Sequence, residues 1–64
     1  MDMKLDLEGA IERCTKSAIR ALKRNDEDSA FNSLKALVHM YIRMYNFQKA
    51  EVIIRVAREV FNDF

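Results

Sequence analysis

The near absence of helix-stopping residues is the feature that most limits what this chain can fold into. The sequence has no proline and one glycine, Gly9. Without such residues long stretches can remain helical, and the abundant Ala, Leu, Glu, Lys and Arg lose little freedom in a helix. Apolar residues recur every three or four positions, which places them on one side of a helix. The sequence therefore predicts an all-α fold.

A charged segment marks the first helix boundary. The first predicted helix covers about residues 5–24, and Lys23 and Arg24 in its last turn suit the negative end of the helix dipole. Residues 25–29 are acidic or polar and interrupt the apolar pattern. Several of them can cap a following helix, and the pattern does not select one. A second predicted helix covers about residues 29–45.

The boundary between the second and third helices is visible only as a change of phase. When the apolar face of residues 30–45 is extended at about 100° per residue, the later apolar residues fall on the opposite side, a mismatch of roughly 160°. One straight helix cannot bury both sides against a single layer. We therefore expect a tight reversal at residues 45–47, with Asn46 capping a third helix over about residues 46–62. One long helix over 29–62, with its two halves buried by different partners, is the alternative.

The length of 64 residues limits the chain to one domain, residues 1–64. A domain of this size buries only about 60% of its unfolded surface, and one such core supplies roughly 3–5 kcal/mol of net stability. One cysteine excludes an internal disulfide. One histidine without a Cys/His cluster excludes a structural zinc site, and we expect neither metal nor cofactor. We expect an antiparallel three-helix domain that dimerisation completes.

The second and third predicted helices also carry a spaced motif. It combines apolar and aromatic positions, a turn and two small residues: Leu34, Leu37 and Tyr41, then Asn46-Phe47-Gln48-Lys49-Ala50, then Ile54 and Ala57. Over residues 34–57 it resembles a single tetratricopeptide repeat, a helix–turn–helix unit of about 34 residues. Val38 and Tyr45 depart from that pattern, because a small residue and a glycine are usual there, and no proline closes the unit. The resemblance implies an antiparallel hairpin with closely packed helices and a concave face that binds peptides or protein segments.

The second and third predicted helices have more apolar side chains than one face each can bury. Exposed apolar surface of that kind marks association sites, and methionine and aromatic residues are common in such contacts. We expect a protein-interaction or regulatory module that forms a homodimer and holds another protein in its remaining groove. The residues expected at the interface are Tyr41, Met44, Val52, Val56, Phe61 and Phe64.

Residues with catalytic potential are few. His39 lies on the polar side of the second predicted helix, and no serine or cysteine has a spacing that would pair it with a nucleophile. Cys14 lies on the apolar face of the first predicted helix, where a thiol is usually inert. The sequence has no glycine-rich phosphate loop. We expect neither an enzyme nor a binder of small-molecule substrates.

A basic side on the first predicted helix keeps one alternative function open. It is formed by Arg13, Lys16, Arg20, Lys23 and Arg24. The second and third helices would then form a DNA-binding helix-turn-helix, with Lys49, Arg55 and Arg58 facing a groove of the nucleic acid. The net charge of +1 gives no strong field for nucleic acid. A small nucleic-acid-binding regulator is therefore the second choice.

The sequence also predicts where the protein works. Its first residues are too acidic and too interrupted for a secretory signal. Apolar runs such as residues 52–54 are far shorter than a membrane span. The single cysteine is typical of a reducing compartment. We expect a cytoplasmic location without membrane contact.

Overall fold

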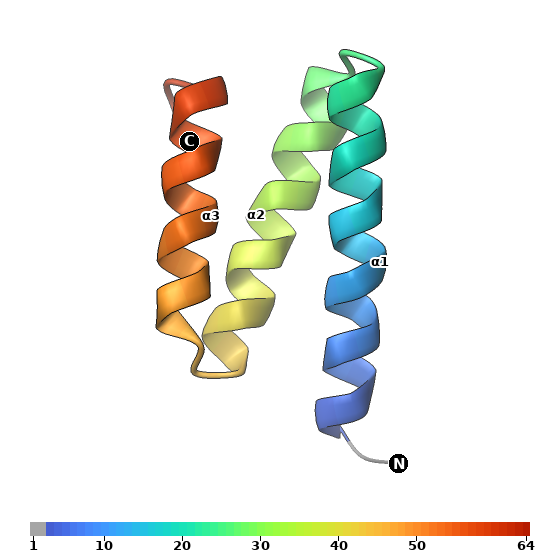
Figure 1. Cartoon of the computed structure of the whole chain (residues 1–64), viewed down its shortest axis with the longest axis vertical. Helices are drawn as coiled ribbons and strands as arrows, with labels where there is room; N and C mark the ends of the chain where they lie inside the picture. Colours follow the sequence, from blue (N-terminus) through green and yellow to red (C-terminus); the bar gives the residue numbers. More distant parts are fainter. Residues whose placement is uncertain (1–2) are drawn as a thin grey trace.

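Three antiparallel helices form the computed structural model of this chain (Figure 1). They are α1 (Met3–Lys23), α2 (Glu27–Arg43) and α3 (Phe47–Val60). The structure describes the backbone of residues 3–64 and the side chains of residues 6–64, and no strand occurs in this part. The predicted all-α, three-helix antiparallel fold is confirmed. The helix ends differ from the predicted ones by one or two residues.

The reversal between α1 and α2 closes both helices with local hydrogen bonds. The Asp26 N–H donates to the Ala21 carbonyl (2.8 Å), and the Asn25 N–H donates to the Leu22 carbonyl (3.2 Å). This pair of bonds is the Schellman arrangement of a helix C-terminus. The Asp26 carboxylate then accepts a hydrogen bond from the Ser29 N–H (3.3 Å). Hydrogen bonding from the Ser29 hydroxyl, and secondly from this N–H, lowers the pKa of Asp26 below its ordinary value. Asp26 is therefore the cap that the acidic segment alone did not identify.

The reversal between α2 and α3 repeats the same arrangement. The Asn46 N–H donates to the Tyr41 carbonyl and the Tyr45 N–H to the Ile42 carbonyl, both at 2.9 Å. The Asn46 Oδ1 accepts from the Lys49 N–H (3.3 Å), which confirms the predicted cap. The chain reverses at this point, so the alternative of one continuous helix is wrong.

Tyr45 occupies the left-handed position of this second reversal, with φ 58°, and its side chain is 82% exposed. A left-handed conformation costs an L residue roughly 1–2 kcal/mol, while glycine adds roughly 0.5–1 kcal/mol of backbone entropy cost. Its one aromatic contact is edge-on to Phe47, at 6.3 Å between centroids. We expect Tyr45→Gly to stabilise the fold by about 0.5–1 kcal/mol in urea unfolding.

The matched control is Asn25→Gly, at the equivalent left-handed position of the first reversal (φ 58°). Asparagine tolerates this conformation better than other non-glycine residues, so we expect a smaller gain there. A loss of stability in Tyr45→Gly would contradict the prediction, because it would mean that the tyrosine ring makes contacts that outweigh its backbone strain.

The helices form one layer and not a closed bundle. α2 packs against both α1 and α3, whereas the backbones of α1 and α3 do not approach each other within the described residues. The Cα atoms span 36 × 21 × 12 Å, and Figure 1 shows α2 between the other two helices and set back from them. Such a layer leaves one side of α1 and one side of α3 without a neighbour.

The core of this layer is small. Among the described side chains, those that are buried and hydrophobic are Ala18, Ala21, Ala30, Leu34, Leu37, Val38, Ala50 and Ala57. Most of these are alanines, which let helices approach closely but bury little area each. Leu37 is the largest fully buried side chain among them. The monomer therefore has a thin core for its length.

Candidate functional site

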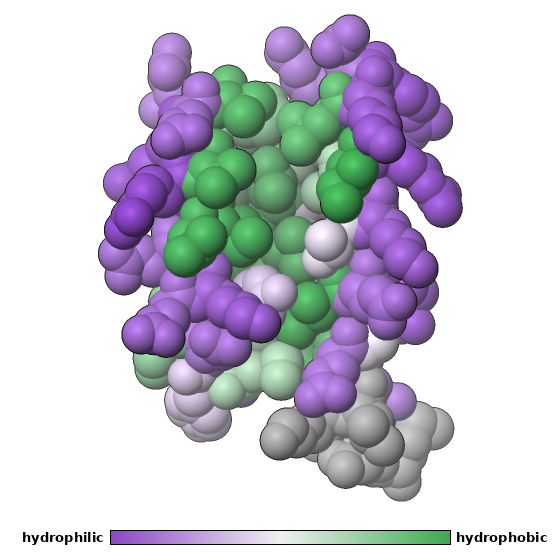
Figure 2. Space-filling model, in the orientation of Figure 1, coloured by the Kyte–Doolittle hydropathy of each residue, from purple (hydrophilic) through white to green (hydrophobic). Residues whose placement is uncertain are grey.

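An apolar groove runs between α1 and α3, with α2 as its floor. Figure 2 shows this face of the layer, where hydrophobic side chains gather in a central band between two hydrophilic borders. At one end of the band an open hollow of about 290 Å³ is lined by residues of all three helices. We call the whole feature the α1–α3 groove. Burial and helical phase assign to it Ile11, Ile19 and Leu22 of α1, Ala30, Leu34 and Tyr41 of α2, and Ile53, Val56 and Val60 of α3.

Helical phase places the α1 residues on the groove side. Cys14 faces α2, because its Sγ donates a hydrogen bond to the Ser33 carbonyl (3.1 Å). Ile11, Ile19 and Leu22 lie about 60–140° further round the helix, all in the same direction. Ile19 and Leu22 are exposed, whereas Ile11 packs against the core cluster. The wall thus changes from half-buried near the floor to exposed at the rim.

The third helix has two apolar sides. Ala50 and Ala57 are buried against α2, and Ile53, Val56 and Val60 lie about 60–120° round the helix from that line. This second side points toward α1, because Val60 lines the same hollow as Leu22. Val56 is 48% exposed and Val60 53% exposed. A helix that packs against one neighbour needs one apolar side. The second apolar side of α3 is therefore available for another contact.

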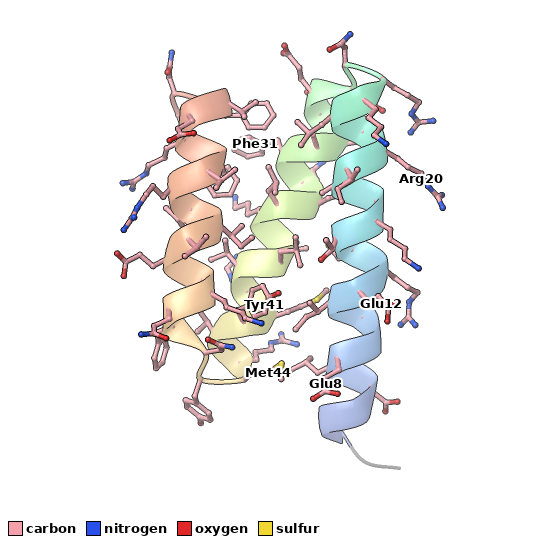
Figure 3. The ribbon with its side chains drawn as sticks, in the orientation of Figure 1. Glu8, Glu12, Arg20, Phe31, Tyr41 and Met44 are labelled. Atoms are coloured by element: carbon pink, nitrogen blue, oxygen red, sulfur yellow. The ribbon has the colours of Figure 1, made fainter. Side chains whose placement is uncertain are left out.

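Tyr41 lies on the groove floor. Figure 3 shows its side chain in the space between α3 and α1, and the Lys49 Nζ lies 5.9 Å from the centre of its ring. That distance is within the range of a cation–π contact. His39 is exposed on α2, and its helical phase puts it on the face opposite the groove. The floor therefore offers a half-buried aromatic ring with one cation beside it.

Charges at the rim of the groove differ between its two ends. Glu8 and Glu12 lie on the N-terminal half of α1 (Figure 3), and their phase puts them near the rim. Lys23 has a similar phase at the C-terminal end of α1. On α3 the order is reversed, with Lys49 near the start and Glu59 near the end. Each wall therefore carries opposite charges at its two ends, and the two walls have opposite order.

The predicted interface residues do not form one surface in the structure. Tyr41 belongs to the groove floor, and Val56 to the α3 wall. Val52 is exposed further round α3, and Met44 is half-buried at the end of α2. Phe61 and Phe64 instead pack edge-on against Phe31, at 5.4 and 5.2 Å between ring centres. These two phenylalanines close one end of the α2–α3 pair within the chain.

Several groove residues were not among those predicted. They include Ile19 and Leu22 of the α1 wall and Val60 of the α3 wall, all three of which are exposed. The signal that could have found Val60 is its spacing of four from Val56, which forms a stripe separate from that of Ala50 and Ala57. For α1 the amphipathic pattern does not distinguish a groove wall from a buried face.

His39 and Cys14, the two side chains with catalytic potential, lie outside the groove floor. Partial burial raises the pKa of the Cys14 thiol, which disfavours the reactive thiolate.

Among the described residues no three His, Cys, Asp or Glu side chains are grouped to hold a metal ion. None of the helices in the described part combines the length and apolar character that crossing a bilayer requires.

Comparison with family models, curated proteins and solved structures returned no match for this chain. The tetratricopeptide resemblance stays a prediction.

Proposed function

We propose that this chain is a small protein-interaction module, of the adaptor or inhibitor type, that binds an apolar protein surface in the α1–α3 groove. The observation that carries the proposal is the separation of α1 from α3 in a single layer. That separation leaves Leu22, Val56 and Val60 exposed around one hydrophobic floor. Contiguous apolar surface with a polar border is typical of protein-binding sites.

The shape and chemistry of the groove favour a helical segment as its ligand. Amphipathic helices dock by placing an apolar stripe into an apolar groove. The floor is made of small or half-buried residues, namely Ala30, Leu34 and Tyr41, so a docked helix can approach α2. The cytoplasm is the compartment we propose, since a lone, half-buried thiol such as Cys14 suits reducing conditions.

The nucleic-acid alternative receives less support from the arrangement of the helices. A DNA-binding helix-turn-helix has its two helices at about 90–120°, whereas α2 and α3 lie antiparallel side by side (Figure 1). The basic residues Arg13 and Arg20 belong to α1, away from α3. We therefore prefer the protein-binding proposal.

Site-specific photo-cross-linking tests whether the groove binds protein. p-Benzoylphenylalanine replaces Val56 in the groove or, as the matched control, Ile42, which is 42% exposed compared with 48% for Val56 and lies outside the groove. We expect irradiation in the native cell extract to give a discrete protein adduct from position 56 only. Leu22→Lys on the opposite wall should abolish that adduct, because a buried unpaired charge is costly.

Two results would contradict the proposal. Position 56 could give no adduct beyond those of position 42, or its adduct could persist unchanged with Leu22→Lys. The mass of the adduct also separates a second copy of this chain from a different protein.

A further inference from the structure

We propose that the protein bound in the α1–α3 groove is a second copy of this chain, in a twofold dimer in which α3 of each copy lies parallel to α3 of the other and enters its groove. This inference rests on the proposed function and names the partner of that same groove. Four features of the described residues support it: the single layer, the exposed area, the second apolar side of α3 and the charges at the rim.

The single layer is an incomplete architecture. Stable domains consist of two or more packed layers around a shared core, whereas within the described residues the backbones of α1 and α3 each lie against α2 and not against each other. Two copies placed groove to groove would form two layers. Leu34 and Tyr41 would then lie in the middle of a shared core and not at its edge.

The exposed area agrees with one missing interface. The chain exposes 5083 Å² for a mass of 7.5 kDa. A compact monomer of that mass exposes about 4,250 Å² by the usual size scaling. The excess of roughly 800 Å² equals the area that one partner buries in an interface of standard size. A dimer through the groove would therefore lower the exposed area of each chain to about that of a compact monomer of its own mass.

The occupant is α3 because of its second apolar side. Ile53, Val56 and Val60 have the i, i+3, i+7 spacing of helices that bind in grooves. The groove side of α1 also carries Ile11, Ile19 and Leu22, but Glu8 and Thr15 interrupt that stripe. The stripe on α3 from Ile53 to Val60 is uninterrupted, so α3 is the helix that we place in the partner's groove.

Charge selects the parallel orientation. With the twofold axis along the helices, Glu59 of a docked α3 lies level with Lys23 of α1. In the antiparallel orientation Glu59 would lie level with Glu12, and like charges are unfavourable at an interface. In the parallel orientation Ile53 and Val60 of one α3 face the same residues of the other α3 across the twofold axis.

The first test measures mass in solution by sedimentation equilibrium, from low-micromolar to sub-millimolar concentration. We expect wild type to have twice the chain mass of 7.5 kDa. Val56→Lys should have the single-chain mass, because it places two lysines against each other in the shared core. The matched control Ile42→Lys, at a similarly exposed site outside the groove, should remain a dimer. Circular dichroism verifies that each variant retains its helices.

The second test uses the symmetry of the arrangement and does not depend on Val56→Lys folding. Single cysteines replace Val60 or Val52 in a Cys14→Ala background. Both valines are 53% exposed, but they lie about 80° apart on α3. Mild oxidation should link two chains through position 60, which faces its mate, and much less through position 52.

Three results would overturn the dimer as described. They are a wild-type protein with the single-chain mass at every concentration, a dimer that survives Val56→Lys, and equal or absent cross-linking at positions 60 and 52. The first of these, combined with a heterologous photo-adduct from position 56, would refute the dimer and leave the protein-binding groove standing. Absence of any groove-specific photo-adduct would refute both.

Discussion

Leu37→Ala is expected to leave most of the protein unfolded at room temperature. Leu37 is 2% exposed and belongs to the cluster that joins all three helices. Truncation of a buried leucine to alanine costs about 2–5 kcal/mol, whereas a core of this size supplies roughly 3–5 kcal/mol in total. The expected result is loss of most of the helical circular-dichroism signal in the absence of denaturant.

The control for Leu37→Ala is Ile42→Ala on the same helix. Ile42 is 42% exposed, so its truncation should cost less than about 1 kcal/mol. Both variants should be measured at several protein concentrations, because association stabilises the folded state by mass action. A Leu37→Ala protein that unfolds at nearly the wild-type urea concentration would show that its stability comes from somewhere other than this cluster.

Ala57→Leu is expected to separate α3 from α2. Ala57 is 0% exposed and belongs to a buried cluster with Leu34 and Leu37 of α2 and Ala18 of α1. Additional methylene groups in a well-packed core usually cost about 1–3 kcal/mol. Because the backbones of α1 and α3 do not touch, hydrogen exchange should accelerate most in α3 and least in α1.

The control for Ala57→Leu is Ala36→Leu, which adds the same atoms to α2. Helical phase places Ala36 on the side of α2 opposite the groove, and Ala36 is half-buried whereas Ala57 is fully buried. We expect a change within about 0.5 kcal/mol there. A uniform acceleration of exchange in all three helices of Ala57→Leu would contradict the prediction, because it would show that the layer opens as one unit.

Local pattern was sufficient to predict the helices. The phase break between Tyr41 and Ile53 predicted a reversal without any glycine or proline, and the Asn46 cap was identified correctly. Both inferences depend on residues that are near each other in the chain. The residue that caps α2 could not be identified from the sequence, because Asp26 and several of its neighbours can all act as caps. The path of the backbone decides which of them faces the first free N–H groups of the helix.

The groove could not be predicted in the same way. An amphipathic pattern places Leu22 on the apolar side of α1, and that side would be buried in a closed bundle where the outer helices touch. Phe61 and Phe64 illustrate the converse, since the chain beyond α3 folds back onto Phe31 and half-buries both rings. Which apolar side chains remain exposed depends on how the helices are arranged, and that information is not contained in the period of any single helix.

The tetratricopeptide resemblance gains one physical detail. Its usual glycine corresponds to Tyr45, which has a positive φ, the conformation that glycine adopts most easily. The antiparallel hairpin of α2 and α3 agrees with the expected shape. A hairpin of this kind is also a common solution for any two short amphipathic helices, so kinship does not follow from it.

The layered arrangement also determines how the chain can acquire its structure. In the described residues, every close approach between helix backbones joins consecutive helices, so the main docking steps need no closure of the whole chain. Short loop closures cost little entropy, and proteins dominated by such local contacts fold within microseconds to milliseconds. We expect α2 to act as the template on which either neighbour docks independently, with assembly of two chains as the slower, concentration-dependent event.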